Sequence, residues 1–454
     1  MKKKLASFFI ALLFISVNAE AKVQGDAFLD SLEHRTFNFF WETTNPANGL
    51  TPDRFPTKSF SSIAAVGFAL TAYPIGIERG YITREQAIGR VLTTLRFFWN
   101  AKMGIDKTGT TGYKGFYYHF LNMNSGTRFG DVEVSTIDSA LLMYGALFCQ
   151  TYFDRNTSEE KEIRSLADSL YRRMDWHSMQ RDKPLVNMGW TPEEGYAKLN
   201  WEGMNEAAFL YILALGSPTF PIESEAWTAW TKTYIWAKYY GMEFISFGPL
   251  FGHQFSHCWI DFRGIYDDYM RKKGIDYFEN SRRATLSQRE YAIENPLHYK
   301  DYSDSIWGFT ASDGPGDTTI IIDGVKRRFQ GYTAHGVSFD WVNDDGTITP
   351  EAPGGSIPFA PDVCIASLKA MEEKYGDHLW RKYGFVDAFN PTFPSSDGFG
   401  WFDHDYLGID QGPILLMLEN YRSGFIWNIM KKNPYIVKGL LRAGFSGGWL
   451  EGKQ

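Results

Sequence analysis

The sequence predicts an all-α protein in which paired helices form a closed ring around one core, an (α/α) toroid with a β-hairpin and long loops around a pocket. Segments with apolar residues at three- and four-residue spacing recur about a dozen times, far more often than strand-like runs. So many helices exceed what a four-helix bundle holds. No Pro/Ser linker or low-complexity segment divides the 454 residues. We therefore expect a single domain over residues 22–454.

The predicted helices have Gly or Pro near many of their ends. They cover residues 26–41, 62–80, 83–100, 135–153, 159–175, 203–215, 223–240, 261–273, 281–295, 361–375, 411–423 and 434–443. Two regions depart from this pattern. Residues 113–134 contain two strand-like runs around the turn 122–126, which predicts a hairpin. Residues 307–358 are non-helical and too long for a simple connector, as expected of loops that form a site on a rigid scaffold.

The first 21 residues predict a secretory signal peptide. A basic start at Lys2, Lys3 and Lys4 is followed by an apolar run over residues 5–17 and by the small-x-small sequence Ala-Glu-Ala at 19–21. No Cys follows the apolar run, so we expect no lipid anchor. No later stretch approaches the roughly 18 apolar residues of a membrane span. We therefore expect a soluble bacterial protein that is secreted or periplasmic.

Composition narrows the class of function. A formal charge of −7, with 22% charged and 44% apolar residues, fits a globular protein with a large core and gives no basic face for nucleic acid. The 17% share of aromatic residues is high, and many of them stand in Gly-, Asn- and Asp-rich loops. The three cysteines are widely separated and odd in number, so buried free thiols are expected rather than disulfides.

Carboxylates gather at the starts of two long apolar helices. Asp131, Glu133 and Asp138 precede or open the helix at 135–153, and Glu202 and Glu206 open the one at 203–215. Cleavage of a glycosidic bond needs one carboxylic acid to protonate the leaving oxygen and one carboxylate to activate water or attack. Flat aromatic faces match the CH faces of a sugar ring. The combination favours carbohydrate chemistry.

Each carboxylate also has a structural interpretation. The run Ser135-Thr136-Ile137-Asp138 fits a capping box, in which Ser135 and Asp138 each bond the backbone at the helix start. Asp131 and Glu133 can share one solvated strand face or bind sugar hydroxyls. Glu202 can favour a helix N-terminus. Glu206 lies deeper, and a like charge four residues away would raise its pKa in an enclosed site, as a general acid requires.

A second acidic group lies near the C-terminus. Asp403 and Asp405 flank His404, between Trp401 and Tyr406. Asp410 stands at a helix start and is interpreted as its cap. Neither the Asp-His-Asp run nor the His253/His257 pair has the further ligands of a recognisable metal site, so we expect no metal and no other cofactor.

Six segments together resemble a known family: GTRFGDVEVSTIDSALL, NWEGMNEAAFL, GPLFGHQFSHCWIDFRG, WGFTASDGP, TPEAPGGSIPFAPD and GWFDHDYLGIDQGP. They are similar to the secreted bacterial glucoamylase-like proteins grouped with the endo-β-1,2-glucanases of glycoside hydrolase family 144. The resemblance extends over nearly the whole mature chain. It implies a single (α/α)6 barrel with a pocket at one end. It also implies hydrolysis of β-1,2-glucan to short sophorooligosaccharides, with inversion at the anomeric carbon and without a metal.

We predict Glu206 as the general acid and Asp405, before Asp403, as the base, with Asp138 and Asp131 as second-rank candidates. The remaining candidates are aromatic side chains for stacking and polar side chains for hydroxyl groups. They are Trp41, Phe116, Tyr117, Trp201, Trp307 and Trp401, and His119, Arg128, Glu133, Glu202 and Glu351. The expected ligand is a polysaccharide or oligosaccharide, and we expect a monomer.

Two other functions fit the same residues. An (α/α) toroid also carries polysaccharide lyases, in which Tyr117 or His119 would abstract a proton while Arg128 neutralises a uronate. An acidic pocket would repel that substrate. A non-catalytic glycan-binding protein of a polysaccharide-uptake system would use the aromatic residues equally well, but it gives no reason for several carboxylates to converge.

Overall fold

The computed structural model describes residues 26–181 and 184–453, so the expected signal peptide lies outside the described residues. The α-helices are α2 (Ala27–Thr43), α3 (Ile63–Glu78), α4 (Arg84–Asn100), α5 (Thr136–Tyr152), α6 (Ser158–Arg172), α7 (Ala208–Gly216), α8 (Glu225–Thr231), α9 (Phe251–Gln254), α10 (Asp268–Lys273), α11 (Tyr277–Glu294), α12 (Glu351–Gly354), α13 (Pro361–Tyr375), α14 (Gly408–Ser423), α15 (Phe425–Met430) and α16 (Pro434–Arg442). Short 3₁₀ helices are η1 (Trp176–Met179), η2 (Phe255–Cys258), η3 (Gly376–His378) and η4 (Gly448–Leu450).

The strands are short. They are β1 (Arg54–Phe55), β2 (Ser61–Ser62), β3 (Gly112–Tyr113), β4 (Phe116–Tyr118), β5 (Phe120–Leu121), β6 (Val134–Ser135), β7 (Gly189–Thr191), β8 (Gly195–Tyr196), β9 (Trp236–Tyr239), β10 (Met242–Ile245), β11 (Ala311–Ser312), β12 (Thr318–Ile322), β13 (Val325–Phe329), β14 (Thr333–Ala334), β15 (Gly336–Val337), β16 (Val342–Asn343), β17 (Trp380–Arg381), β18 (Gly384–Phe385), β19 (Phe389–Asn390), β20 (Trp401–Phe402) and β21 (Tyr406–Leu407). The order β3-β4-β6-β7-β8 makes a five-stranded antiparallel sheet, and the other strands pair two by two. Helices therefore dominate, which confirms the helix-rich class.

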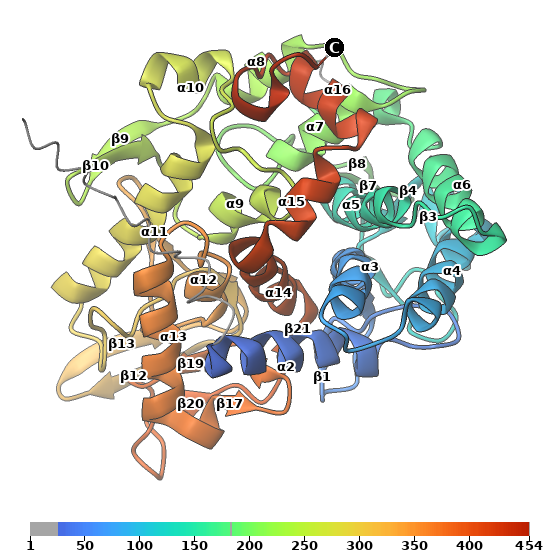
Figure 1. Ribbon diagram of the computed structural model, residues 1–454. Coiled ribbons are helices and arrows are strands. Elements are labelled where there is room, and N and C mark those ends of the chain that lie inside the picture. The colour runs from blue at the N-terminus through green and yellow to red at the C-terminus, as the bar shows by residue number, and fades with distance from the viewer. Residues whose placement is uncertain (1–25, 182–183, 454) are drawn as a thin grey trace, which may run out of the picture.

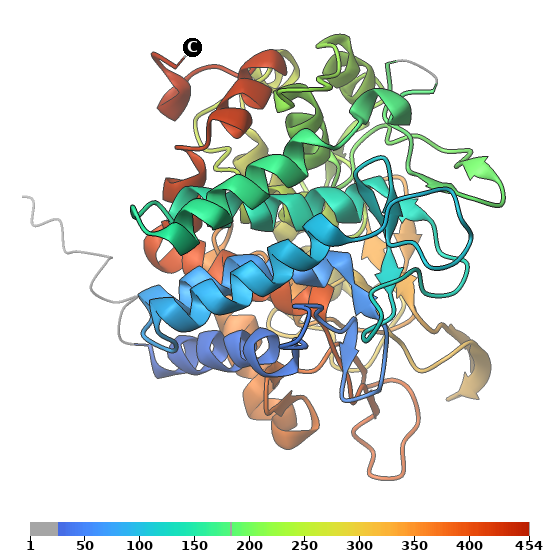
Figure 2. The same cartoon turned by 90° about the vertical axis from the view of Figure 1, so that its right-hand side faces the viewer.

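The helices form inner and outer layers around a common centre (Figure 1). Almost every residue of α3, α5, α7 and α14 is buried, as expected of helices that are apolar on all sides. Helices α2, α4, α6 and α16 cover them. In Figure 2, α2, α4 and α6 are aligned, and most strands and long loops gather at one end of the helices. That end holds the candidate site.

The two central helices α3 and α5 approach each other at a pair of glycines. A Cβ on Gly67 would lie 2.3 Å from the carbonyl oxygen of Leu141, and a Cβ on Gly145 would lie 2.2 Å from the carbonyl oxygen of Gly67. Any side chain at either position would separate the two backbones. The close contact fixes the start of α5, which carries Asp138.

A buried ionic cluster joins α2, α3 and α14. Arg422 Nη1 lies 2.5 Å from Glu33 Oε2, and Arg79 Nε binds Glu33 and Glu419 at 3.2 and 2.7 Å. The Arg422 side chain is 5% exposed and that of Glu33 is fully buried. Removal of one partner of a buried ion pair leaves the other charge without compensation in a medium of low polarity.

Replacing Arg422 by Met should therefore lower the free energy of unfolding by about 3–5 kcal/mol. The matched control is Arg96→Met, since Arg96 pairs with Glu162 at the surface, where both side chains are about half exposed. That change should cost less than about 1 kcal/mol. Urea unfolding measures both changes in the free energy of unfolding. Equal losses for the two variants would contradict the prediction that the buried ionic cluster contributes more stability than the surface ion pair.

Three predicted helices are markedly shorter than expected, and one of them, predicted over 203–215, begins only at Ala208 in α7. The segment predicted over 223–240 is helical only in α8, and its second half forms the β9–β10 hairpin, turning at Gly241 with φ of 79°. Its aromatic and β-branched residues pack better on a paired strand. The segment predicted over 261–273 is helical only in α10, because Gly264 at φ of 71° interrupts the chain.

The two non-helical regions are confirmed in outline. Asn122 N donates to Thr127 O, and Leu121 and Arg128 form an antiparallel bridge, as in the predicted hairpin. Residues 307–358 carry the strands β11 to β16, with α12 as a single helical turn. All three cysteines are buried and free, as predicted. Among the described helices, none has the length and apolar character to cross a bilayer.

Candidate active site

A cavity of about 430 Å³ opens where the N-termini of α5, α7 and α14 meet the small strands. Its volume falls in the range of small-molecule sites, roughly 300–1,000 Å³. Four carboxylates line it, from different parts of the chain: Glu133, Asp138, Glu206 and Asp410. Among its other lining residues are His119, Trp201, Phe251, Phe255, Ala311 and Tyr332. The cavity thus combines acidic side chains with an aromatic wall.

Glu206 lies in the turn before α7 rather than inside the helix. Its side chain faces the cavity and is half-buried, and its carbonyl oxygen accepts a hydrogen bond from Ser256 Oγ at 3.0 Å. Burial raises the pKa of Glu206 to about 7, with a further contribution from the Asp138 carboxylate. The side chain is thus protonated in a useful fraction of molecules at neutral pH.

Asp138 is held by the start of α5 and by a histidine. Ser135 Oγ accepts the Asp138 amide at 3.2 Å and donates to Asp138 Oδ2 at 2.5 Å, so one half of the predicted capping box forms. His119 lies 2.9 Å from Glu133 and 3.5 Å from Asp138. Burial alone would lower the pKa of His119, but Asp138 and Glu133 raise it to about 9. His119 is therefore held between two carboxylates that line the cavity.

Asp410 lines the cavity and belongs to a cluster of neighbouring carboxyls behind the lining. We call this cluster the acidic floor and define it as Asp313, Asp387, Asp403, Asp410 and Glu351. Asp410 is not the cap of α14, because Leu407 occupies that position without a side-chain bond. Asp410 instead lines the cavity, and its Oδ2 has no hydrogen-bond partner among the described residues.

Burial and neighbouring carboxylates raise the pKa values of four floor residues, Glu351, Asp387, Asp403 and Asp410. Burial comes first for Asp410 and Glu351, and neighbouring carboxylates bring the pKa of each to about 8. Burial and the adjacent Asp410 hold the pKa of Asp387 well above its usual range. Two carboxyls in contact bind one proton between them and retain one charge. The Asp387–Asp410 pair can therefore accept a further proton.

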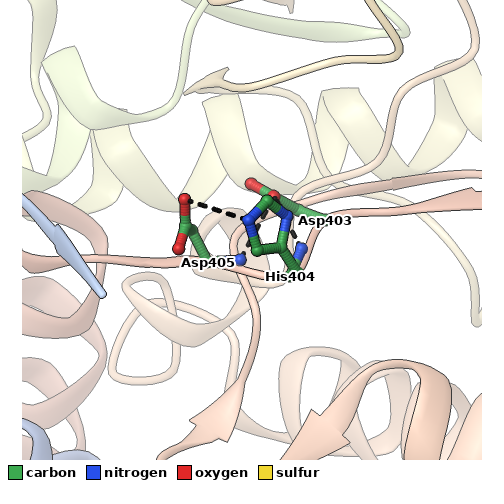
Figure 3. A group of neighbouring side chains, drawn as sticks. All are labelled: Asp403, His404 and Asp405. Atoms are coloured by element: carbon green, nitrogen blue, oxygen red, sulfur yellow. Dashed lines mark hydrogen bonds and ion pairs between the residues drawn. The ribbon is translucent and has the colours of Figure 1, made fainter. Parts of the chain in front are cut away.

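Asp403, a member of the floor, and Asp405 lie on the loop between β20 and β21 (Figure 3). Asp405 Oδ1 accepts the Thr57 amide at 2.8 Å, and Asp403 Oδ1 accepts the amides of His404 and Asp405 at 2.6 and 3.2 Å. Both side chains are buried and neither lines the cavity, whereas His404 projects to solvent. Asp410 therefore has an access to the cavity that Asp405 and Asp403 lack, which makes it a further candidate for the base.

Several predicted sugar-binding residues belong to the protein interior. Phe116, Tyr117 and Trp307 are fully buried, and the Tyr117 hydroxyl donates to Phe98 O at 3.1 Å. Trp41 packs against Tyr73 and under Arg90, away from the cavity. None of these four residues lines the cavity, because strand pairing and helix packing cover aromatic residues that the local sequence places in loops.

The remaining candidates divide between the cavity and other surroundings. Trp201, His119 and Glu133 line the cavity, and their role in binding sugar stays a prediction. Arg128 is buried in an ion pair with Glu193 at 2.9 Å. Outside the cavity lining, Asp131 is exposed, Trp401 is half-buried on β20, and Glu351 lies behind Asp410, whereas Glu202 faces a neighbouring cavity.

Sequence reasoning missed Tyr332 and the floor residues Asp313 and Asp387. Tyr332 stands at the mouth of the cavity with 57% of its surface exposed. Burial of its hydroxyl end and the Asp410 charge raise its pKa. Asp313 stands in the segment WGFTASDGP, but no local pattern marked this residue as part of a site. No sequence pattern pointed to Asp387 as a site residue.

Two acidic groups among the described residues are close enough to share a cation: Asp313, Asp387 and Asp403, and Asp403, His404 and Asp405. Hydrogen-bond donors of the protein already occupy carboxylate oxygens of Asp313 and Asp387 in the first group. Arg54 Nη1 lies 2.6 Å from Asp313 Oδ2, and the Asp313 amide donates to Asp387 Oδ2 at 2.7 Å. Extensive EDTA treatment should therefore change neither activity nor melting temperature. A loss that Ca²⁺ or Zn²⁺ restores would contradict this and identify the floor as a metal site.

Comparison with known proteins adds to this geometry. The family described as "Putative glucoamylase" matches residues 198–434. A "putative glucoamylase" of Bacteroides uniformis ATCC 8492 superposes with a TM-score of 0.82 at 34% identity, over 96% of this chain and 99% of its own. The endo-β-1,2-glucanase of Chitinophaga pinensis, in complex with sophorotriose and glucose, has a TM-score of 0.81 at 28% identity, over 95% and 100% of the two chains.

A curated relative gives a second named activity. The exo β-1,2-glucooligosaccharide sophorohydrolase (non-reducing end) of Parabacteroides distasonis is 28% identical over 447 residues, which cover 91% of this chain. The chain spans 57% of the length of that protein. The match of the family over more than half of the sequence, and the full-length similarity to the Bacteroides protein, confirm the resemblance stated above: this chain belongs to the glucoamylase-like family.

Proposed function

We propose that the protein is a glycoside hydrolase that cleaves β-1,2-glucan, by an endo-acting, inverting mechanism that releases sophorooligosaccharides. The observation that carries the proposal is the cavity in which a protonatable Glu206 shares a wall with Trp201 and faces ionisable carboxylates. Its relatives include an endo-β-1,2-glucanase and a β-1,2-glucooligosaccharide sophorohydrolase, which supports the choice of linkage.

The scaffold that we propose is a single (α/α)6 toroid over residues 22–454. In support, inner helices α3, α5, α7 and α14 alternate along the chain with outer helices, and the described buried apolar residues form one continuous core. We further propose that residues 1–21 are removed on export and that the mature protein acts as a monomer outside the cytoplasm.

In the proposed reaction, Glu206 gives its proton to the glycosidic oxygen as the bond to C1 breaks. A water molecule attacks C1 from the opposite face, and its proton passes to the Asp387–Asp410 pair through Asp410. The product is released with inverted anomeric configuration. Asp138, which lies beside His119, raises the pKa of Glu206 and can accept hydrogen bonds from sugar hydroxyls.

The experiment that tests the proposal is incubation of the purified protein with linear β-1,2-glucan, β-1,3-glucan, starch and a polyuronate. We expect sophorooligosaccharides from β-1,2-glucan alone, with the α-anomer formed first by NMR. Absorbance from 4,5-unsaturated products would show a lyase instead. Binding of the glucan without cleavage would show a glycan-binding protein.

A further inference from the structure

A second cavity of about 480 Å³ adjoins the candidate active site. Phe251 lines both cavities. Two further segments also reach both: the segment that carries Glu206 presents Glu202 to the second cavity, and the segment that carries Tyr332 presents Ala334. Three separate parts of the chain thus form a common wall, so the two cavities are neighbouring compartments of one cleft.

Trp341 supplies a flat apolar wall in the second cavity. It stands next to β16, and 42% of its surface is exposed. A Cβ on Gly248 would lie 2.3 Å from Trp341 Cε3, so the indole rests directly on the backbone of Gly248. Ile235, 47% exposed, also lines this cavity. Large apolar side chains left open together in a concave site are typical of ligand-binding surfaces.

Fixed polar groups accompany this wall. Asp340 precedes Trp341, and its Oδ1 accepts hydrogen bonds from Ser246 Oγ at 2.5 Å and Ser338 Oγ at 3.2 Å. The carboxylate is therefore held at the edge of the cavity, and the exposed Glu202 lies on the same lining. A flat aromatic face with carboxylate acceptors at its edge suits a sugar ring, which offers CH groups on its faces and hydroxyl donors at its rim.

We infer that the second cavity is a glycan subsite, on the side of the leaving group, in which Trp341 stacks on a sugar ring of the substrate chain. This inference rests on the proposed function. A general acid lies on the leaving-group side of the bond that it cleaves, and the segment of Glu206 leads to the second cavity through Glu202. Asp410, the proposed base, lines the first cavity and not the second.

The test measures KM for a series of β-1,2-glucooligosaccharides of increasing length. In the wild type, KM should fall as the chain becomes long enough to enter the second cavity. Trp341→Ala should remove that gain and raise KM for long chains roughly tenfold, while kcat and KM for the shortest cleaved oligosaccharide stay unchanged. Gly248→Ala, which displaces the indole without removing it, should have the same effect on long chains.

The matched control is Trp99→Ala, because Trp99 is 43% exposed and lines neither cavity. It should keep the dependence of KM on chain length. A Trp341→Ala variant with wild-type KM at every length would overturn the subsite, and so would an equal loss at every length including the shortest. Absence of turnover on β-1,2-glucan by the wild type would instead refute the proposed function, so the two failures are distinguishable.

Discussion

Glu206→Gln should lose at least ~100-fold in turnover of β-1,2-glucan, the usual contribution of a general acid. The amide has nearly the shape of the carboxyl but cannot give a proton to the leaving oxygen. Since Glu206 is half-buried at the edge of the cavity and its side chain lies outside the helix, the melting temperature should change little. Steady-state kinetics and thermal unfolding on the same samples measure both effects.

The pH dependence gives an independent check of this role. A general acid acts in its protonated form, so kcat/KM of the wild type should fall as the pH rises through about 7, where Glu206 loses its proton. That limb should be absent from the residual activity of Glu206→Gln. Glu202→Gln is the control, because Glu202 stands on the same segment but faces the second cavity. In this variant kcat/KM should still fall as the pH rises through about 7. Near-normal turnover of Glu206→Gln would exclude Glu206 as the acid.

The second large effect is expected at Asp410. Asp410→Ala should reduce kcat by at least ~100-fold, because water loses the carboxylate that orients it and takes its proton. Added formate or azide should restore part of the activity by occupying the space of the missing group. Only a group at the reacting centre allows such rescue, so a structural role would not produce it.

The control variants are Asp405→Asn and Asp403→Asn. Asp405 holds the Thr57 amide and Asp403 two amides of its own loop, so their losses should be smaller and formate should not rescue them. If Asp405→Asn were the most damaged variant, the order predicted from the sequence would be right after all. If all three retained full activity, Asp138 would be the remaining cavity-lining candidate for the base.

Local sequence predicted the scaffold well. The helix at 361–375 has the bounds of α13, and the starts of α4 and α16 are correct within one residue. Ser135 caps α5 as its position before Asp138 indicated. These features depend on residues within one or two turns of each other, through periodicity, capping and the conformations that Gly and Pro allow. Helix bounds and caps that depend on such local interactions can be predicted from a short stretch of sequence.

The segments 200–216 and 129–149 also predicted part of the site, since Glu206, Asp138 and Glu133 line one cavity with Trp201. Their position at the cavity end could be inferred because each precedes or opens an apolar helix, and the starts of these helices lie at one end of the molecule. The aromatic residues were less predictable. Tyr117 and Trp307 stand in irregular sequence, and only the packing of distant helices makes them core.

By itself, then, the sequence determined a helix-rich member of the glucoamylase-like family with carboxylates at the starts of its inner helices. Only the tertiary structure decided which carboxylates share a floor. Asp313, Asp387 and Asp410 belong to three separate segments, and burial together with carboxylates of other segments raises the pKa values of Asp387 and Asp410. The same holds for Trp341, which rests on Gly248 some ninety residues earlier. Contact between residues distant in sequence follows from how helices and loops pack, and no local pattern encodes it.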